Sequence, residues 1–331
     1  MSDSGQQFNT IVGGYERLEY AAELIKRGEI VAFPTETVYG LGGDALNTSA
    51  LNKIFEAKNR PKDNPFILHV TDIEQADRVA HVTGEAEKLF KLFSPGPLTI
   101  VMRKRECVPY EATAGLDTVG VRIPSHPMCR EFLTLCDIPV AAPSANLSKK
   151  VSPTCAEHVY EDMAGRIPLI LDGGECNVGI ESTVLSLATD IPTILRPGII
   201  TEERLAEVLG EIVTHKGEVK RAAAPGMKYR HYAPIVPCYL FKDDGNAISA
   251  YDSWERENLR TIILCKGESR FGERNCLSLG DDGVEIAKNV FRELRNVEKK
   301  YDRILIEHLS LTGEEGSVMN RLIKSCDGNF I

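Results

Sequence analysis

Hydrophobic and polar positions along the chain follow two different periods, and the change of period marks the predicted elements. In residues 16–27, four apolar side chains recur at helical spacing, and Gly28 follows them. A glycine just past an apolar stripe is typical of a helix end. The pattern therefore predicts an amphipathic helix over 16–27, and the apolar residues 30–34 after it predict a short buried strand.

The same reasoning predicts both kinds of element through the first two thirds of the chain. We expect helices at 49–58, 85–93, near 155 and at 202–209. β-branched and apolar runs favour strands. We expect such strands at 98–102, 117–124, 138–143, 169–171, 179–185 and 193–196.

The amino-acid composition of the sequence changes after residue 212. Residues 213–235 include a charged stretch, three consecutive alanines, and the prolines at both ends of 225–234. We interpret 213–235 as an interdomain linker between a first domain, 1–212, and a second, 236–331. Two tyrosines, a histidine and two cations within 225–234 exceed what a tether needs, and they predict a lid as well.

Strands and helices alternate again beyond the linker. We expect strands at 237–241, 261–265 and 303–306, and helices at 286–297 and 317–324. Alternation of this kind is typical of a small α/β domain with a mostly parallel sheet. This part of the sequence carries no dense group of polar residues, so we expect it to support or regulate the first domain.

Composition narrows the class of protein. A chain of 331 residues with 43% hydrophobic and 26% charged residues is typical of a globular protein with more than one domain. The net charge of −9 argues against a general nucleic-acid coat protein. We expect no signal peptide, because the start of the chain lacks a basic segment followed by an apolar one. We expect no membrane span, because no apolar run is long enough to cross a bilayer. Nine scattered cysteines without a Cys-x-x-Cys pair indicate reduced thiols and a cytoplasmic protein.

A basic stretch, Lys58–Pro65, precedes the apolar run 66–70. It holds three cations within five positions, and two prolines bracket the second half. Prolines restrict their own backbone and that of the preceding residue, so a rigid turn leading into a buried strand is predicted. Fixed Lys and Arg side chains suit a polyphosphate, whereas the alternative is a solvated basic loop.

Two glycine patterns resemble nucleotide-binding loops. Residues 40–45 match Gly-x-Gly-x-x-Ala, which allows a nicotinamide oxidoreductase as an alternative, although a polar Thr-Glu-Thr turn separates the strand from the glycines. Gly174 and Gly179 have P-loop spacing. Residues 180–181 are Ile-Glu where a P-loop needs Lys-Ser or Lys-Thr, so the sequence excludes a Walker A loop.

Arg122 stands inside an apolar strand, between Val121 and Ile123. It either faces water from an edge strand or faces the carboxylate of a ligand. Small and hydroxyl residues at 144–148 and 152–154 follow another strand. They allow close backbone approach to a ligand, or they form a turn and a helix cap.

Five motifs in a fixed order resemble the threonylcarbamoyl-AMP synthase family. They lie at 33–41, 58–61, 94–99, 142–146 and 195–198, and 225–234 resembles the linker of the family's long two-domain form. The resemblance implies an α/β fold, in which a twisted open α/β sandwich of YrdC type carries a basic concave cavity. A smaller Rossmann-like α/β domain would follow it.

The resemblance also implies an activity, which is condensation of L-threonine, bicarbonate and ATP to L-threonylcarbamoyl-adenylate and pyrophosphate. The adenylate would pass to a downstream tRNA threonylcarbamoyl transferase complex. Mg²⁺ would enter with ATP, held mostly by phosphates and waters, because the sequence shows no metal-ligand spacing. No residue need become covalently attached, since positioning and charge neutralisation are enough for such a transfer.

Site residues follow motif by motif. The resemblance implies that threonine contacts Thr37, His69, Arg122, Ala142 and Ser182. It implies that the nucleotide contacts Lys58, Arg60, Asn64, Thr118, Ser144, Asn146, Ser152 and Arg196, with His231 or Tyr232 closing over it. An RNA-binding module is the remaining alternative, and weak direct RNA binding stays open. The net acidity and the lack of alternating aromatic and basic residues argue against RNA binding as the main function.

Overall fold

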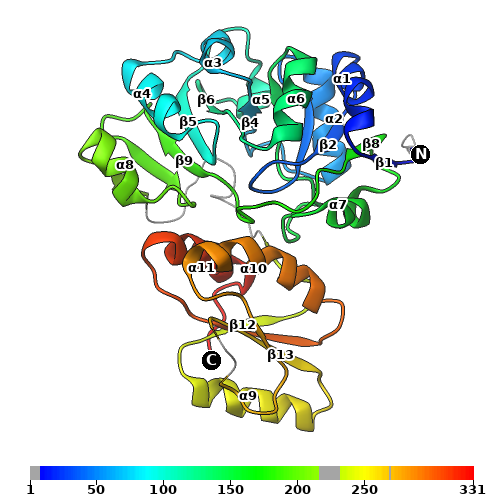
Figure 1. Ribbon diagram of the computed structural model, residues 1–331, viewed down its shortest axis with the longest axis vertical. Coiled ribbons are helices and arrows are strands. Elements are labelled where there is room, and N and C mark those ends of the chain that lie inside the picture. The colour runs from blue at the N-terminus through cyan, green and yellow to red at the C-terminus, as the bar shows by residue number, and fades with distance from the viewer. Residues whose placement is uncertain (1–7, 216–231, 268–269) are drawn as a thin grey trace.

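The computed structural model of the protein describes residues 8–215, 232–267 and 270–331, which form two units with separate sheets (Figure 1). Each unit places helices against its sheet, so the α/β class predicted for both halves is confirmed. The predicted linker lies largely outside the described residues, and the domain boundaries at 212 and 235 stay predictions.

The first unit is built on a mixed sheet of eleven strands of the described chain, in the order β1-β8-β2-β3-β7-β4-β6-β5-β9-β10-β11. Its strands are β1 Ile11–Gly13, β2 Val31–Phe33, β3 Gly40–Asp44, β4 Ile67–His69, β5 Leu98–Arg103, β6 Thr118–Arg122, β7 Val140–Ala141, β8 Leu169–Leu171, β9 Thr183–Ser186, β10 Thr193–Arg196 and β11 Val213–Thr214. Its helices are the 3-10 helix η1 Tyr15–Arg17 and the α-helices α1 Leu18–Lys26, α2 Thr48–Lys58, α3 Ile73–Val79, α4 Gly84–Phe93, α5 Tyr110–Thr113, α6 Pro127–Cys136, α7 Ala156–Met163 and α8 Glu202–Leu209.

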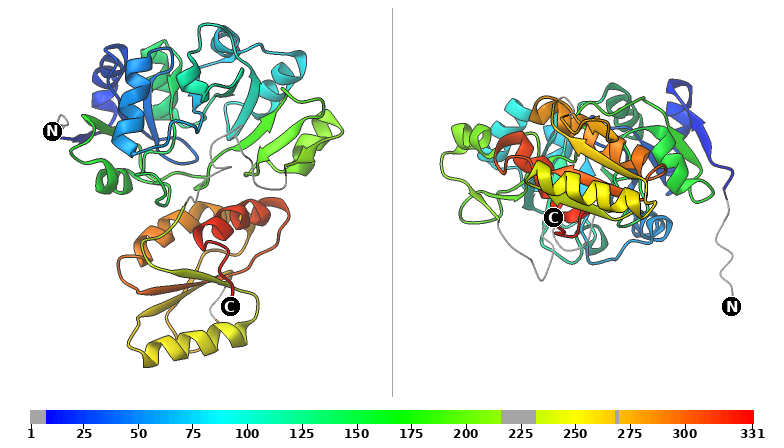
Figure 2. Two further views of the ribbon diagram at one scale, coloured as in Figure 1. Left: turned by 180° about the vertical axis from the view of Figure 1, so that it is seen from behind. Right: turned by 90° about the horizontal axis from the view of Figure 1, so that it is seen from below.

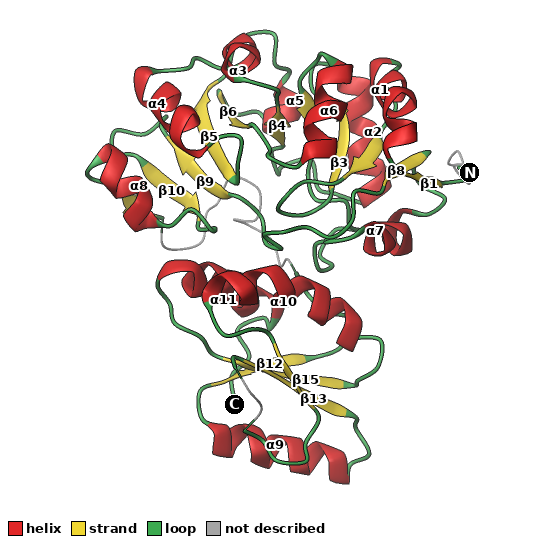
Figure 3. Ribbon diagram, viewed as in Figure 1, coloured by secondary structure: helices red, strands yellow, loops and turns green. Residues whose placement is uncertain are grey.

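The second unit has a parallel sheet of four strands in the described chain, in the order β12-β15-β13-β14. Its elements are β12 Cys238–Phe241, α9 Asp244–Arg256, β13 Thr261–Cys265, β14 Cys276–Ser278, α10 Gly283–Val297, β15 Arg303–Glu307 and α11 Gly313–Ser325. Helix α9 covers one face of this sheet, and α10 and α11 cover the other face, which is turned toward the first unit (Figures 2 and 3).

Helix α2 shows how local sequence sets an element that reaches the site. The Asn47 side chain accepts a hydrogen bond from the backbone N–H of Ser49 at 2.9 Å and so caps the first turn. At the other end Asn59 takes a left-handed backbone with φ 51°, which ends the helix at Lys58. The two ends of the helix therefore fix the position of Lys58, its last residue.

The two units share an apolar contact. Val38, Val151 and Ile180 of the first unit belong to the same buried cluster as Val290 and Phe291 of α10. The same cluster contains the core residues of the second unit. The two units therefore contact each other through buried apolar side chains as well as through polar groups.

Most predicted elements are confirmed within a few residues, and the clearest error concerns residues 35–45. The sequence predicts a polar, glycine-rich turn there, but Gly40–Asp44 form β3, which pairs antiparallel with β2. A Cβ on Gly42 would stand 2.6 Å from the Phe33 ring, so the glycine makes room for packing on the sheet. The dinucleotide-loop interpretation of these glycines is therefore wrong. In the part of the chain that the structure describes, no helix is both long and apolar enough to cross a bilayer.

Candidate active site

A cavity lined mainly by residues of the first unit gathers most of the predicted site residues. Among its lining residues are Thr37, Lys58, Arg60, His69, Arg122, Ala142, Ser144, Asn146, Ser152, Ser182, Arg196 and Tyr232. They come from the end of α2, from β4, β6 and β10, and from the loops beside them. Residues far apart in the sequence thus share one wall, as a substrate site requires.

Two predicted residues that the structure describes, Asn64 and Thr118, are not among those that line the cavity. Asn64 is buried in the turn after Arg60, and its backbone oxygen accepts a hydrogen bond from Arg60 Nη2 at 3.2 Å. Thr118 begins β6, whereas Arg122, which lines the cavity, ends that strand. His231 lies outside the described residues. The assignments of these three residues to the nucleotide stay predictions.

The cavity also contains residues that the sequence reasoning missed. Thr35, Ser148, Lys149, Lys150 and Glu181 line it as well. Each lies within four positions of a predicted residue, so proximity to the motifs in the sequence could have identified them. Glu181, for example, was used only to exclude a P-loop, although the adjacent Ser182 was already predicted to contact threonine.

Arg122, the last residue of β6, lines the cavity. The residue is 4% exposed, so the alternative of an edge-strand arginine in water is wrong. Its Nη1 donates to Thr37 Oγ1 at 2.8 Å, and its Nη2 lies 2.8 Å from Glu36 Oε1. Burial by itself would raise the pKa of the Glu36 carboxyl, but the charge and hydrogen bond of Arg122, together with backbone hydrogen bonds, outweigh burial and lower that pKa.

His69 lies beside Arg122 because β4 and β6 are parallel partners that place these two residues in register. Burial, and then the neighbouring Arg122 charge, lower the pKa of His69 to about 3. The imidazole is therefore neutral at physiological pH. Its Nδ1 is buried and has no hydrogen-bond partner among the described residues, which suits a ligand's polar hydrogen.

Lys58 and Arg60 form the basic side of the cavity. Lys58 is 1% exposed, and its Nζ donates to the carbonyl oxygens of Ser144 and Asn146. Burial lowers the pKa of Lys58 well below its ordinary value. Lys58 is thus a buried residue at a helix end, so the alternative of a solvated basic loop is wrong for this residue.

Arg60 is held by its own turn. Its Nη2 donates to the backbone oxygen of Pro65 at 3.0 Å, and its guanidinium lies 5.4 Å from the centre of the Phe66 ring. The buried Nε has no hydrogen-bond partner among the described residues. Burial lowers the pKa of Arg60 to about 10, which leaves it charged at pH 7.

Strands β9 and β10 pair antiparallel and bring Arg196 next to Ser182. The Arg196 guanidinium donates to the Ser182 backbone oxygen at 3.0 and 3.1 Å and to its Oγ at 3.2 Å. Ser182 Oγ also lies 2.8 Å from Thr99 Oγ1. These contacts fix the orientation of the guanidinium, which is a precondition for electrostatic catalysis.

The second unit contacts the cavity in two ways: Arg321 binds Glu181, which lines the cavity, and Tyr232 lines the cavity itself. Glu181 Oε1 accepts a hydrogen bond from Ser152 at 2.6 Å, and Arg321 of α11 donates to Oε2 at 3.2 Å. The Tyr232 ring stacks on Phe291 of α10, with 5.2 Å between ring centres. Burial, and then the Glu181 charge, raise the pKa of Tyr232 to about 12, so its hydroxyl keeps its proton.

The charges favour an anionic ligand. Lys58, Arg60, Arg122, Arg196 and two further lysines line the cavity, against the carboxylate of Glu181. Such an arrangement can bind phosphates and stabilise charge that develops on them. Among the residues that the structure describes, no group of three or more His, Cys, Asp or Glu side chains could hold a metal ion.

Comparisons with known proteins agree with this geometry. The sequence model of the Sua5/YciO/YrdC family, described as telomere recombination, matches residues 23–198. The model of the threonylcarbamoyl-AMP synthase C-terminal domain matches residues 200–326. These two matches cover both units.

Individual relatives match along nearly their whole length. The threonylcarbamoyl-AMP synthase of Pyrococcus abyssi is 43% identical over 93% of this chain and 94% of its own. That of Bacillus subtilis is 41% identical over 95% and 94%. The crystal structure of P. abyssi Sua5 complexed with L-threonine superposes with a TM-score of 0.92, at 42% identity, over 97% of this chain and 98% of its own.

Proposed function

The chain belongs to the threonylcarbamoyl-AMP synthase family of nucleotidyltransferase-type enzymes, and we propose on this basis that it condenses L-threonine, bicarbonate and ATP. The products would be L-threonylcarbamoyl-adenylate and pyrophosphate. This reaction would be the first step of a tRNA modification, and a downstream tRNA threonylcarbamoyl transferase complex would use the adenylate.

Two groups of residues that line the cavity carry the proposal. Thr37, His69 and Arg122 adjoin one another, and a guanidinium and a neutral imidazole suit the carboxylate and ammonium or hydroxyl groups of an amino acid. Lys58 and Arg60 would supply the cations for the phosphates of a nucleotide. A relative has been crystallised with L-threonine, which supports the first assignment.

The chemistry needs positioning and charge more than covalent catalysis. The threonine amine, once uncharged, attacks the carbon of bicarbonate and expels water to leave a carbamate. A carbamate oxygen then attacks the α-phosphorus of ATP, the bond to the β-phosphate oxygen breaks, and pyrophosphate leaves. Arg60 and Arg196 would stabilise the negative charge that develops on the phosphates.

We also propose that Mg²⁺ reaches the site as part of the MgATP substrate. The cavity's carboxylate, Glu181, already accepts hydrogen bonds from Ser152 and Arg321, so it has little left to offer a metal ion. Phosphate oxygens and waters suit the octahedral demands of Mg²⁺. The ion would neutralise pyrophosphate as it departs.

A product assay tests the proposal directly. Purified protein is incubated with MgATP and radiolabelled bicarbonate, with threonine or with each of several other amino acids, and the products are separated by chromatography. We expect pyrophosphate and a labelled adenylate only when threonine and bicarbonate are both present. Equal pyrophosphate release without threonine would contradict the assignment.

A further inference from the structure

One short loop, residues 144–152, forms the wall of the cavity where the nucleotide is proposed to bind. Several other parts of the protein contact this loop. Asn146 Nδ2 donates to the backbone oxygens of Leu147 at 2.8 Å and Lys150 at 2.9 Å, which ties the loop to itself. Lys58 of α2 donates to carbonyl oxygens of the same loop. The position of the wall therefore depends on what holds this loop.

Asp162 of α7 binds two residues in the middle of this loop, Leu147 and Lys150. Its side chain is 1% exposed. Its Oδ2 accepts a hydrogen bond from the Leu147 backbone N–H at 3.3 Å, and its Oδ1 accepts one from Lys150 Nζ at 2.8 Å. A buried carboxylate needs a charged partner, because burial alone would favour its neutral form.

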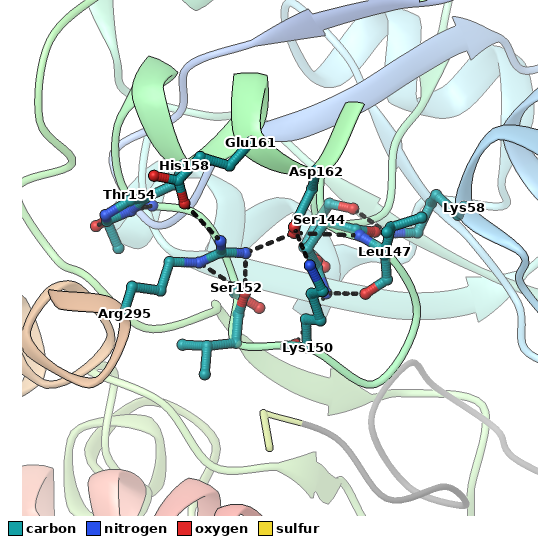
Figure 4. Close-up of polar contacts among 12 residues, drawn as sticks. Lys58, Ser144, Leu147, Lys150, Ser152, Thr154, His158, Glu161, Asp162 and Arg295 are labelled. Carbon is teal, nitrogen blue, oxygen red and sulfur yellow. Dashed lines mark hydrogen bonds and ion pairs between the residues drawn. The ribbon is translucent and has the colours of Figure 1, made fainter. Parts of the chain in front are cut away.

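Lys150 is one such partner, and Arg295 of α10 supplies a second, more deeply buried one from the second unit. Its side chain is 3% exposed, and its Nη2 donates to Asp162 Oδ2 at 2.7 Å. The same guanidinium donates to the Val151 backbone oxygen, from Nε at 3.1 Å and from Nη2 at 2.5 Å. Figure 4 shows the chain of contacts from Arg295 through Asp162 to the loop and on to Lys58.

We propose that Arg295 is a positioning residue for the nucleotide side of the cavity, an inference that rests on the proposed function. One guanidinium fixes the loop both directly, at Val151, and through Asp162. Arg122 and His69, which are proposed to contact threonine, do not depend on it, because the pairing of β6 and β4 in the first unit sets their positions. Arg295 thereby acts on one substrate site and leaves the other unchanged.

The alternative is that Arg295 only docks the two units. Arg292 of the same helix provides the matched control, because its Nη1 lies 3.0 Å from Glu175 Oε2 across the same contact. That pair is much more exposed, with side-chain exposures of 29% and 58%, and neither residue lines the cavity. Loss of docking alone should affect both substrates equally.

The experiment compares Arg295→Lys, Arg295→Ala and Arg292→Ala in the full chain. KM for ATP, KM for threonine and kcat are measured together with equilibrium binding of a non-hydrolysable ATP analogue. We expect KM for ATP to rise about 10-fold in Arg295→Lys, which keeps the charge but loses the forked geometry, and up to about 100-fold in Arg295→Ala. KM for threonine should stay within about 2-fold, and Arg292→Ala should match the unsubstituted enzyme.

Several outcomes would overturn the inference. They are unchanged ATP kinetics in both Arg295 variants, equal increases in KM for both substrates, an effect of Arg292→Ala as large as that of Arg295→Ala, or failure of both Arg295 variants to fold. The unsubstituted enzyme separates this inference from the proposed function. If it does not form the adenylate at all, the proposed function fails, and if it does while the variants behave normally, only the role of Arg295 fails.

Discussion

His69 shows at the residue scale how burial changes the chemistry of a side chain. Its pKa of about 3 in the folded protein lies far below the ordinary value of 6.5. Between these values the unfolded chain binds a proton that the folded protein does not, so stability falls as the pH decreases through 6.5 toward 3. From pH 7 to pH 5, His69 should lower the free energy of unfolding by about 2 kcal/mol.

Urea unfolding of the unsubstituted protein and of His69→Gln at pH 7 and pH 5 tests this expectation. The variant should lose about 2 kcal/mol less than the unsubstituted protein over this interval. His158, whose pKa burial also lowers, to about 4, is present in both proteins and cancels in the comparison. An identical pH dependence would mean that His69 titrates normally.

Arg60 and Lys62 belong to the same turn, but only Arg60 lines the cavity. Arg60→Ala should lower kcat/KM by roughly 10²- to 10³-fold, the range for losing one preorganised electrostatic contact. The loss of its two hydrogen bonds to backbone oxygens should lower the free energy of unfolding by about 1–3 kcal/mol, because the side chain is half-buried. Steady-state kinetics and thermal unfolding measure the two effects.

Lys62→Ala is the control for this prediction. Lys62 is exposed, and its Nζ contacts Asn52 Oδ1 at 2.8 Å, away from the cavity. Its loss should change neither kinetics nor stability by much. Full activity of Arg60→Ala, or an equal loss in Lys62→Ala, would restore the interpretation of this stretch as a solvated basic loop.

At the scale of elements, Gly179 allows α10 to approach the first unit. It has φ +78°, and a Cβ there would stand 2.4 Å from the backbone oxygens of Ala287 and Lys288. Gly174 has nearly the same backbone, φ +81°, but nothing lies within 4 Å of its Cβ position. The pair separates the effect of backbone strain from that of close packing.

Both glycines should be replaced by alanine and compared by thermal unfolding and ATP kinetics. Gly174→Ala should cost about 1 kcal/mol, from the left-handed backbone alone. Gly179→Ala should cost several times more, at least about 3 kcal/mol, because α10 must move, and KM for ATP should rise as Arg295 moves with the helix. Equal losses in the two variants would show that α10 does not pack tightly on this glycine.

The elements also show what a sequence can predict and what it cannot. Helices with a clear apolar stripe, such as α8, and strands with apolar runs, such as β5, follow from local pattern. Strand β3 does not, because Gly40–Asp44 has the composition of a turn and is a strand only through its packing against β2 and β7. The motif residues of the cavity were predictable, but Asp162 and Arg295 are 133 positions apart and meet only through the packing of the two units.

At the scale of the whole molecule, the second unit completes a cavity that the first unit carries. A chain ending at His215 keeps every strand of the first sheet, β11 included. It lacks Tyr232, Arg295 and Arg321, which contribute to the cavity wall or support it. Removing them leaves the carboxylates of Asp162 and Glu181 without their guanidinium partners and uncovers apolar side chains that the two units share.

The truncated chain should therefore fold but lose most of its adenylate-forming activity. Once the second unit is gone, water can reach Asp162, so the missing ion pair costs less than an unpaired buried charge, which is typically about 3–5 kcal/mol. The loop 144–152 loses its hold at Val151, so binding of an ATP analogue should weaken more than binding of threonine, whose contacts stay in the first sheet. Circular dichroism, calorimetric binding of each ligand and pyrophosphate release measure the three effects. Full activity in the truncated chain would mean that the second unit has no part in shaping the site.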